Sequence, residues 1–233
     1  MEGGVIYFIT GANRGIGFQL TRALLLRENT TVVATKRGLE TSSVDLEGLP
    51  RAENSRIDVL ILNAGAATSF ESARETRMEE LWAHFEVQQI VVLRGKKVFW
   101  MSRGWLVDDK GGDGERHKQK KIVYISSFLG SIEGTDDATP SLAYGISKAG
   151  ANYFVRKVHF EEGGEGSGIV SLAVHPGWIK TQNGQTFADS VGVEEPPMSL
   201  EESVEGVLGQ IDTATRETTS GKFVSHNGAI IPW

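Results

Sequence analysis

Cysteine is missing from this chain of 233 residues. Without a thiol, the protein can form neither disulfide bonds nor thiolate metal sites, and it has no cysteine nucleophile. The five histidines are far apart in the sequence and lack the spacing of metal ligands. We therefore expect no metal site.

The chain also lacks a net positive charge and long apolar runs. The formal net charge is -6 and the basic residues are scattered, which argues against binding to nucleic acid or to an anionic membrane. The apolar run Val5-Ile6-Tyr7-Phe8-Ile9 is only five residues long, and no stretch is long enough to span a bilayer. We expect a soluble, cytoplasmic protein that forms one domain over residues 1–233.

Short β-branched and aromatic runs alternate with helical patterns. Strands are predicted at 5–9, 30–35, 59–62, 122–125, 170–174 and 222–225, with a helix after the first strand. Another helix, at about 200–211, begins with the capping pair Ser199 and Glu202. This order predicts an α/β fold, a Rossmann-type doubly wound parallel sheet. Polar segments 131–141 and 182–197 follow strands, and we interpret them as ligand-contacting loops, with a substrate-loop region around 182–198.

Three spaced glycines separate the first strand from the first helix, in Thr10-Gly11-Ala12-Asn13-Arg14-Gly15-Ile16-Gly17. In this position glycines allow a tight turn and let backbone N–H groups approach a pyrophosphate at the helix N-terminus. A P-loop is excluded because the Gly-Lys-Ser/Thr ending is missing. The alternative is a tight turn without a ligand.

The spacing Gly-x-x-x-Gly-x-Gly resembles the short-chain dehydrogenase/reductase family. Four further matches follow in the family's order: Leu62-Asn63-Ala64-Gly65, Ser126-Ser127, Tyr144-Gly145-Ile146-Ser147-Lys148 and Pro176-Gly177-Trp178-Ile179-Lys180-Thr181. Within the family, Ala151-Asn152-Tyr153, Thr218-Thr219-Ser220-Gly221-Lys222-Phe223 and Pro232-Trp233 are similar to the fungal norsolorinic acid ketoreductase group of polyketide pathways.

The resemblance implies a nicotinamide dinucleotide site. Where a carboxylate at the end of the second strand would select NAD, this chain has Lys36 and Arg37, which with Arg14 could surround a 2'-phosphate. We predict NADP(H); the alternative is that these cations only solvate a sheet edge. The expected cofactor-binding residues are Gly11, Asn13, Arg14, Gly15, Ile16, Gly17, Lys36, Arg37, Asn63, Ala64, Gly65, Tyr144, Lys148, Pro176, Gly177, Ile179 and Thr181.

Three residues are the expected catalytic group. Tyr144 and Lys148 are four residues apart and so share a helix face. We predict that Tyr144 donates the proton, that the Lys148 ammonium lowers the pKa of Tyr144 and, as the resemblance implies, holds the nicotinamide ribose. Ser127 can hydrogen-bond the substrate carbonyl. His175 is interpreted as structural. For Trp178 we expect a packing role, with a wall of the substrate site as the alternative.

The predicted function is NADPH-dependent reduction of a ketone, with an aromatic polyketide-like compound of fungal secondary metabolism as a candidate substrate. The expected partner is a small carbonyl compound, and the chain could also form a homo-oligomer.

Two departures from the family pattern stand out. Only nineteen residues separate Arg37 from Ile57, too few for a third strand and both its crossovers, so we expect that strand and its following helix to be missing. Gln88 stands where the family has an Asn that supports Lys148 through water. Both leave open an alternative, a catalytically impaired binding or regulatory protein on a Rossmann fold.

Overall fold

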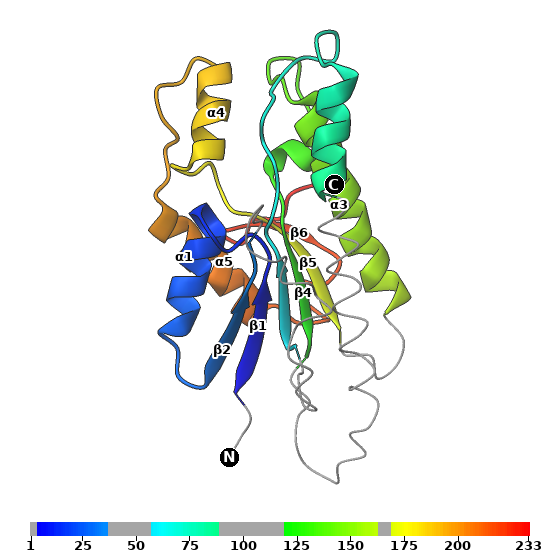
Figure 1. Cartoon of the computed structure of the whole chain (residues 1–233). Coiled ribbons are helices and arrows are strands. Elements are labelled where there is room, and N and C mark those ends of the chain that lie inside the picture. Colours follow the sequence, from blue (N-terminus) through cyan, green and yellow to red (C-terminus); the bar gives the residue numbers. More distant parts are fainter. Residues whose placement is uncertain (1–3, 37–56, 89–118, 163–168) are drawn as a thin grey trace.

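A computed structural model describes residues 4–36, 57–88, 119–162 and 169–233. Within these residues, six strands form one parallel sheet in the order β2-β1-β3-β4-β5-β6 (Figure 1). All neighbouring strands run in the same direction, so their carboxyl ends lie along one edge. The strands are β1 (Val5–Ile9), β2 (Thr30–Ala34), β3 (Val59–Leu62), β4 (Lys121–Ile125), β5 (Val170–His175) and β6 (Phe223–Ser225).

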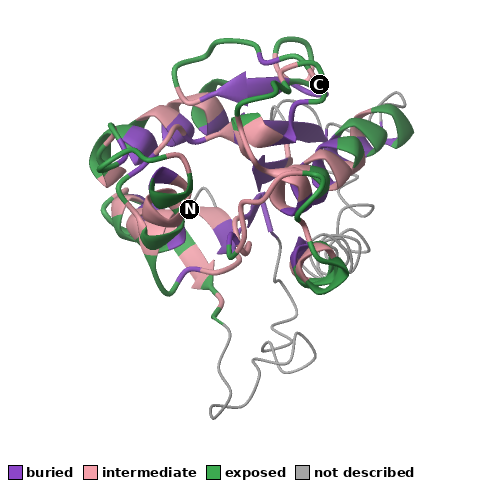
Figure 2. Ribbon diagram, turned by 90° about the horizontal axis from the view of Figure 1, so that it is seen from above, coloured by how far each residue is buried: buried purple, intermediate pink, exposed green. Residues whose placement is uncertain are grey.

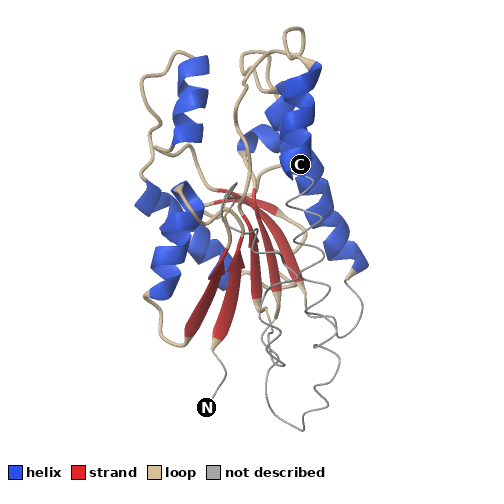
Figure 3. Cartoon of the chain, in the orientation of Figure 1, coloured by secondary structure: helices blue, strands red, loops and turns tan. Residues whose placement is uncertain are grey.

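Helices cover both faces of this sheet (Figure 3). On one face lie α1 (Gly15–Leu25) and α5 (Leu200–Thr213), and on the other lies α3 (Leu142–Glu161). Beyond the carboxyl ends of the strands stands α4 (Gln182–Ser190). A further helical segment runs from Met78 to Gln88, the last described residue at that point.

The core consists of two apolar clusters, one on each face of the sheet. Alternate strand residues point to opposite faces, so Ile61 packs with the α1 and α5 side while Leu60 packs with the α3 side. Buried residues accordingly gather in the sheet and on the helix surfaces turned toward it (Figure 2). The doubly wound parallel sheet predicted from the sequence is thereby confirmed.

The predicted strand ends agree with the observed ones to within one residue. The capping pair is also confirmed, because the Ser199 side chain accepts a hydrogen bond from the Glu202 N–H at 3.1 Å, where α5 begins.

The interpretation of 182–197 as a loop is wrong for its first half, which forms α4. There the Thr181 hydroxyl accepts from the Gly184 N–H at 3.1 Å and caps the helix. The expected loss of a third strand falls on residues 37–56, outside the described residues.

Candidate active site

The glycine loop turns sharply between β1 and α1. Gly11 (φ 67°) and Gly15 (φ 54°) have the left-handed backbone that side chains disfavour. A Cβ on Gly11 would lie 2.9 Å from the Ala64 Cα, and one on Gly17 would overlap the Gly11 carbonyl. Arg14 precedes α1 and gives it no side-chain cap, so the first amides of the helix are left to another partner.

Asn63 joins the ends of β1 and β3. Its side-chain amide donates to the carbonyl oxygens of Thr10 and Gly11, both at 3.0 Å. In return, the Thr10 hydroxyl accepts from the backbone N–H groups of Asn63 at 3.0 Å and Ala64 at 3.1 Å. These four bonds hold the glycine loop above the strand ends.

Ser127, Tyr144 and Lys148 meet where β4 ends and α3 begins. The Ser127 side chain lies next to the Tyr144 phenol and acts to lower its pKa. The Lys148 Nζ donates to the Ile125 carbonyl at 2.9 Å and lies 5.6 Å from the centre of the Tyr144 ring. Gly130 permits this approach, because a Cβ there would lie 2.7 Å from the Lys148 Cβ. The structure therefore brings the three expected catalytic residues together.

Burial sets the charge states of this group. It raises the pKa of Tyr144 to about 12, with the neighbouring Ser127 hydroxyl acting in the opposite direction. It also lowers the pKa of Lys148 to about 7, since it disfavours the ammonium. We expected Lys148 to lower the pKa of Tyr144. In the structure the pKa of Tyr144 is shifted by burial and by Ser127, with no contribution from Lys148, so Tyr144 stays protonated near neutral pH.

Gln88 and Tyr124 form a buried pair behind Lys148. The Tyr124 hydroxyl donates to the Gln88 Oε1 at 2.8 Å, and neither residue is accessible to solvent. Among the described residues, the Gln88 Nε2 has no hydrogen-bond partner. The point where Gly65 would carry a Cβ is 2.8 Å from that nitrogen and 3.5 Å from the Lys148 Nζ. The longer side chain of Gln88 thus still reaches the surroundings of Lys148.

Replacing Gln88 by Leu should lower the free energy of unfolding by about 1–3 kcal/mol, because the Tyr124 hydroxyl then stays buried without an acceptor. Adding Tyr124→Phe to the Gln88→Leu variant should restore most of the loss, and urea unfolding of the two variants measures the difference. A double variant that is no more stable than Gln88→Leu would contradict this account of the pair.

A cleft of about 1120 Å³ opens above the carboxyl ends of the strands. It runs from the glycine loop past Ser127, Tyr144 and Lys148 to α4. Gly17 packs beneath the loop against Asn63, outside the lining, and Arg37 lies outside the described residues. The other expected cofactor-binding residues all line it: Gly11, Asn13, Arg14, Gly15, Ile16, Lys36, Asn63, Ala64, Gly65, Pro176, Gly177, Ile179 and Thr181.

Three aromatic side chains, Phe70, Phe187 and Trp178, form an aromatic wall beside Tyr144. The ring centres are 5.3 Å apart for Tyr144 and Phe70, 5.0 Å for Phe70 and Phe187, and 5.1 Å for Phe187 and Trp178. Of these three residues, the sequence pointed only to Trp178 as a candidate wall of the substrate site. Phe70 and Phe187 come from a loop and a helix that are far apart along the chain, and no local pattern marks them as neighbours.

His84 was also missed. Its Nε2 accepts from the Thr68 N–H at 3.2 Å, and its Nδ1 is 2.8 Å from the Glu80 carbonyl. The ring is fully buried and lies edge-on to Tyr144, with 6.2 Å between the ring centres. His84 therefore ties the loop before Phe70 to the helical segment 78–88 and packs against Tyr144.

Comparison with known proteins decides the family. The short chain dehydrogenase family matches residues 50–191, more than half of the chain. The chain belongs to the short-chain dehydrogenase family. Among its relatives, the norsolorinic acid ketoreductase of Aspergillus parasiticus is 34% identical, over 98% of this chain and 91% of that protein. The norsolorinic acid ketoreductase of Dothistroma septosporum is 30% identical, over 97% and 92%.

Solved structures of other short-chain dehydrogenases share the fold. The NADPH-bound carbonyl reductase from chicken fatty liver has a TM-score of 0.79 and 24% identity, with 99% of this chain and 100% of that one covered. The carbonyl reductase Sniffer of D. melanogaster has a TM-score of 0.79 and 23% identity, with 99% of each chain covered. As a short-chain dehydrogenase, the protein is an oxidoreductase.

The described part of this short-chain dehydrogenase contains no helix that is long and apolar enough to cross a membrane. In the same residues, no three His, Asp or Glu side chains are grouped so as to hold a metal ion.

Proposed function

We propose that this short-chain dehydrogenase uses NADPH to reduce a ketone to a secondary alcohol, and that its substrates are aromatic, polyketide-like ketones. The observation that carries the proposal is that Ser127, Tyr144 and the buried amine of Lys148 line one cleft together. A phenol and a hydroxyl beside one cavity can share the oxygen of one carbonyl.

The glycine-loop end of the cleft fits a dinucleotide. The uncapped first turn of α1 offers amides to a pyrophosphate, and Gly15 leaves room for it. Arg14 and Lys36 are exposed cations that line the same cleft and suit a 2'-phosphate. When bound, the reduced nicotinamide would supply the hydride for the carbonyl carbon. The solved carbonyl reductase from chicken fatty liver is NADPH-bound, which supports this choice.

The residues of the chain supply the remaining chemistry. Tyr144 is protonated near neutral pH and donates its proton to the carbonyl oxygen as that oxygen gains negative charge. Ser127 holds the same oxygen, which fixes the carbonyl opposite the phenol. Lys148 lies one turn along α3 from Tyr144, and its Nζ is the group that would hold a ribose hydroxyl of the bound cofactor.

The aromatic wall supports an aromatic substrate. Flat rings next to the proton donor offer a face on which a planar ketone can stack, and they keep water from that side. The two relatives from Aspergillus parasiticus and Dothistroma septosporum are named as ketoreductases of norsolorinic acid, which supports a ketone as the substrate.

The proposal is tested by following NADPH absorbance at 340 nm with paired aryl and aliphatic ketones of similar size. We expect the aryl ketones to have the higher kcat/KM. If no ketone is reduced while NADPH still raises the unfolding temperature, the protein binds the cofactor without turnover, and the alternative of a binding protein replaces this proposal.

Replacing Lys36 by Ala should weaken NADPH binding about tenfold and leave NADH binding unchanged, because only NADPH has the 2'-phosphate. Fluorescence titration with both cofactors measures the effect. Lys180→Ala is the matched control, since Lys180 is exposed outside the cleft lining and pairs with Glu195 at 2.6 Å. Equal affinities of the unchanged protein for NADH and NADPH would contradict the cofactor choice.

A further inference from the structure

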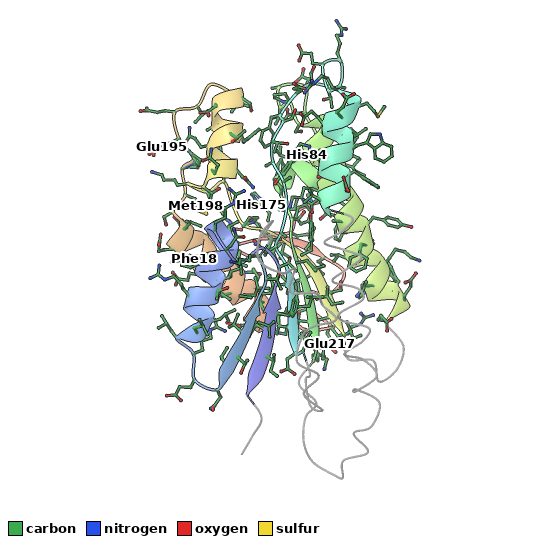
Figure 4. All side chains as sticks on the ribbon, in the orientation of Figure 1. Phe18, His84, His175, Glu195, Met198 and Glu217 are labelled. Carbon is green, nitrogen blue, oxygen red and sulfur yellow. The ribbon has the colours of Figure 1, made fainter. Side chains whose placement is uncertain are left out.

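His175 is the last residue of β5 and lies at the carboxyl end of the sheet (Figure 4). Its side chain lines the cleft. The imidazole Nδ1 accepts a hydrogen bond from the backbone N–H of Phe128 at 3.1 Å. Phe128 directly follows Ser127, so this bond joins β5 to the turn that carries a proposed catalytic hydroxyl.

The turn η1 (Phe128–Gly130) leaves three amides to be paired at its start. The Ser127 Oγ accepts from the Leu129 N–H at 3.3 Å, and the Ser127 carbonyl accepts from the Gly130 N–H at 2.9 Å. The third amide is that of Phe128, and its N–H donates to the Nδ1 of His175. The imidazole therefore completes the set and fixes the peptide group next to Ser127.

The rest of His175 is fixed as well. Its carbonyl accepts from the His226 N–H at 2.8 Å, which ties it to the residue after β6. Burial, and then the neighbouring His226, lower the pKa of His175 to about 4. The ring is thus neutral near pH 7, and since Nδ1 is the acceptor, the proton is on Nε2. A protonated Nδ1 would instead point a donor at the Phe128 N–H.

We propose that His175 is a positioning residue for Ser127. By holding the Phe128 amide, its Nδ1 sets the orientation of the turn and, with it, the direction of the Ser127 hydroxyl toward Tyr144 and the substrate carbonyl. The proposal rests on the proposed ketone reduction only for its catalytic consequence. The anchoring of the turn can be measured without turnover.

Three variants of His175 test the role. His175→Asn keeps an acceptor, Oδ1, at the position of Nδ1, whereas His175→Gln moves it to the position of Nε2 and His175→Leu removes it. We expect kcat to fall about tenfold in the Leu and Gln variants, a loss of about 1.4 kcal/mol in transition-state stabilisation, with KM for NADPH unchanged. The Asn variant should stay within about threefold of the original kcat. Equal kcat values for Asn and Gln would overturn the proposal.

A double-mutant cycle separates positioning from general packing. In a Ser127→Ala background, His175→Leu should cost less than about twofold more in kcat, because the hydroxyl it orients is gone. A further loss of the full tenfold would mean that His175 acts on something other than Ser127, and the proposal would fail.

Amide hydrogen exchange gives the readout that needs no turnover. Exchange in a peptide covering residues 126–130 should be faster in the Leu and Gln variants and unchanged in the Asn variant. Unchanged exchange in all three would overturn the positioning role. If the unaltered protein reduces no ketone, the proposed function fails, and the exchange data still decide whether His175 anchors the turn.

Discussion

Replacing Tyr144 by Phe should lower kcat for ketone reduction by about 10²–10⁴-fold, the usual contribution of a positioned general acid. The phenol is the proton donor of the proposed reaction, and burial keeps it protonated by raising its pKa to about 12. NADPH affinity should change little, because the ring that lines the cleft is kept. Steady-state kinetics and a fluorescence titration measure the two effects separately.

Tyr153→Phe is the matched control for this experiment. Tyr153 is on the same helix, α3, but its side chain is 68% exposed and outside the cleft lining. It should keep the original kcat. A Tyr144→Phe variant with full turnover would remove the phenol from the mechanism, whatever the control shows.

Replacing Lys148 by Met should have opposite effects on activity and on stability. Turnover should fall by at least about a hundredfold, because the amine next to Tyr144 is lost. The free energy of unfolding at pH 7 should rise, because Lys148 is only 4% exposed and its charged form is poorly solvated there. Lys157→Met is the control: Lys157 is exposed on the same helix and pairs with Glu161 at 2.8 Å.

The same residue predicts a dependence of stability on pH. The pKa of Lys148 falls from an ordinary value of 10.5 to about 7 on folding, so between these values the unfolded chain binds more protons than the folded one. The free energy of unfolding of the unaltered protein should therefore rise with pH across that window. Measurements at pH 7 and pH 9 avoid the opposite contribution of Tyr144, which begins above pH 10. The Lys148→Met variant should show a smaller rise, and an identical rise in both proteins would contradict the assignment.

The sheet could be predicted because buried parallel strands have a simple signature. Runs such as Val59–Leu62 are apolar on both faces, and turns or helical patterns bound them, so their ends were found within one residue. The grouping of Ser127 with Tyr144 was instead implied by the family resemblance, which matched Ser126-Ser127 to a strand end and Tyr144 to the start of a helix.

The features that were missed depend on contacts between distant segments. The aromatic wall brings Phe70 and Phe187 together across more than a hundred residues, and their spacing carries no period that a sequence pattern could reveal. The charge state of Lys148 follows from how deeply α3 seats it against Tyr124, which the sequence does not specify. The helix α4 was not predicted because its sequence is mostly polar and has too few apolar residues to show a helical period. Its capping residue, Thr181, was therefore not recognised as a helix start.

The bonds of Asn63 bear on how sequences of this kind are compared. Its amide donates to two backbone carbonyls, those of Thr10 and Gly11, and so joins the ends of the neighbouring strands β1 and β3. An aspartate there would place a carboxylate oxygen, which cannot donate, against the two carbonyl oxygens. A leucine would leave both carbonyls without a hydrogen-bond donor. Asn63 thus supports the fold itself, and the fold needs this support whether or not the protein turns over a substrate. Only the side chains that face the reacting carbonyl can distinguish a working enzyme from an inherited scaffold.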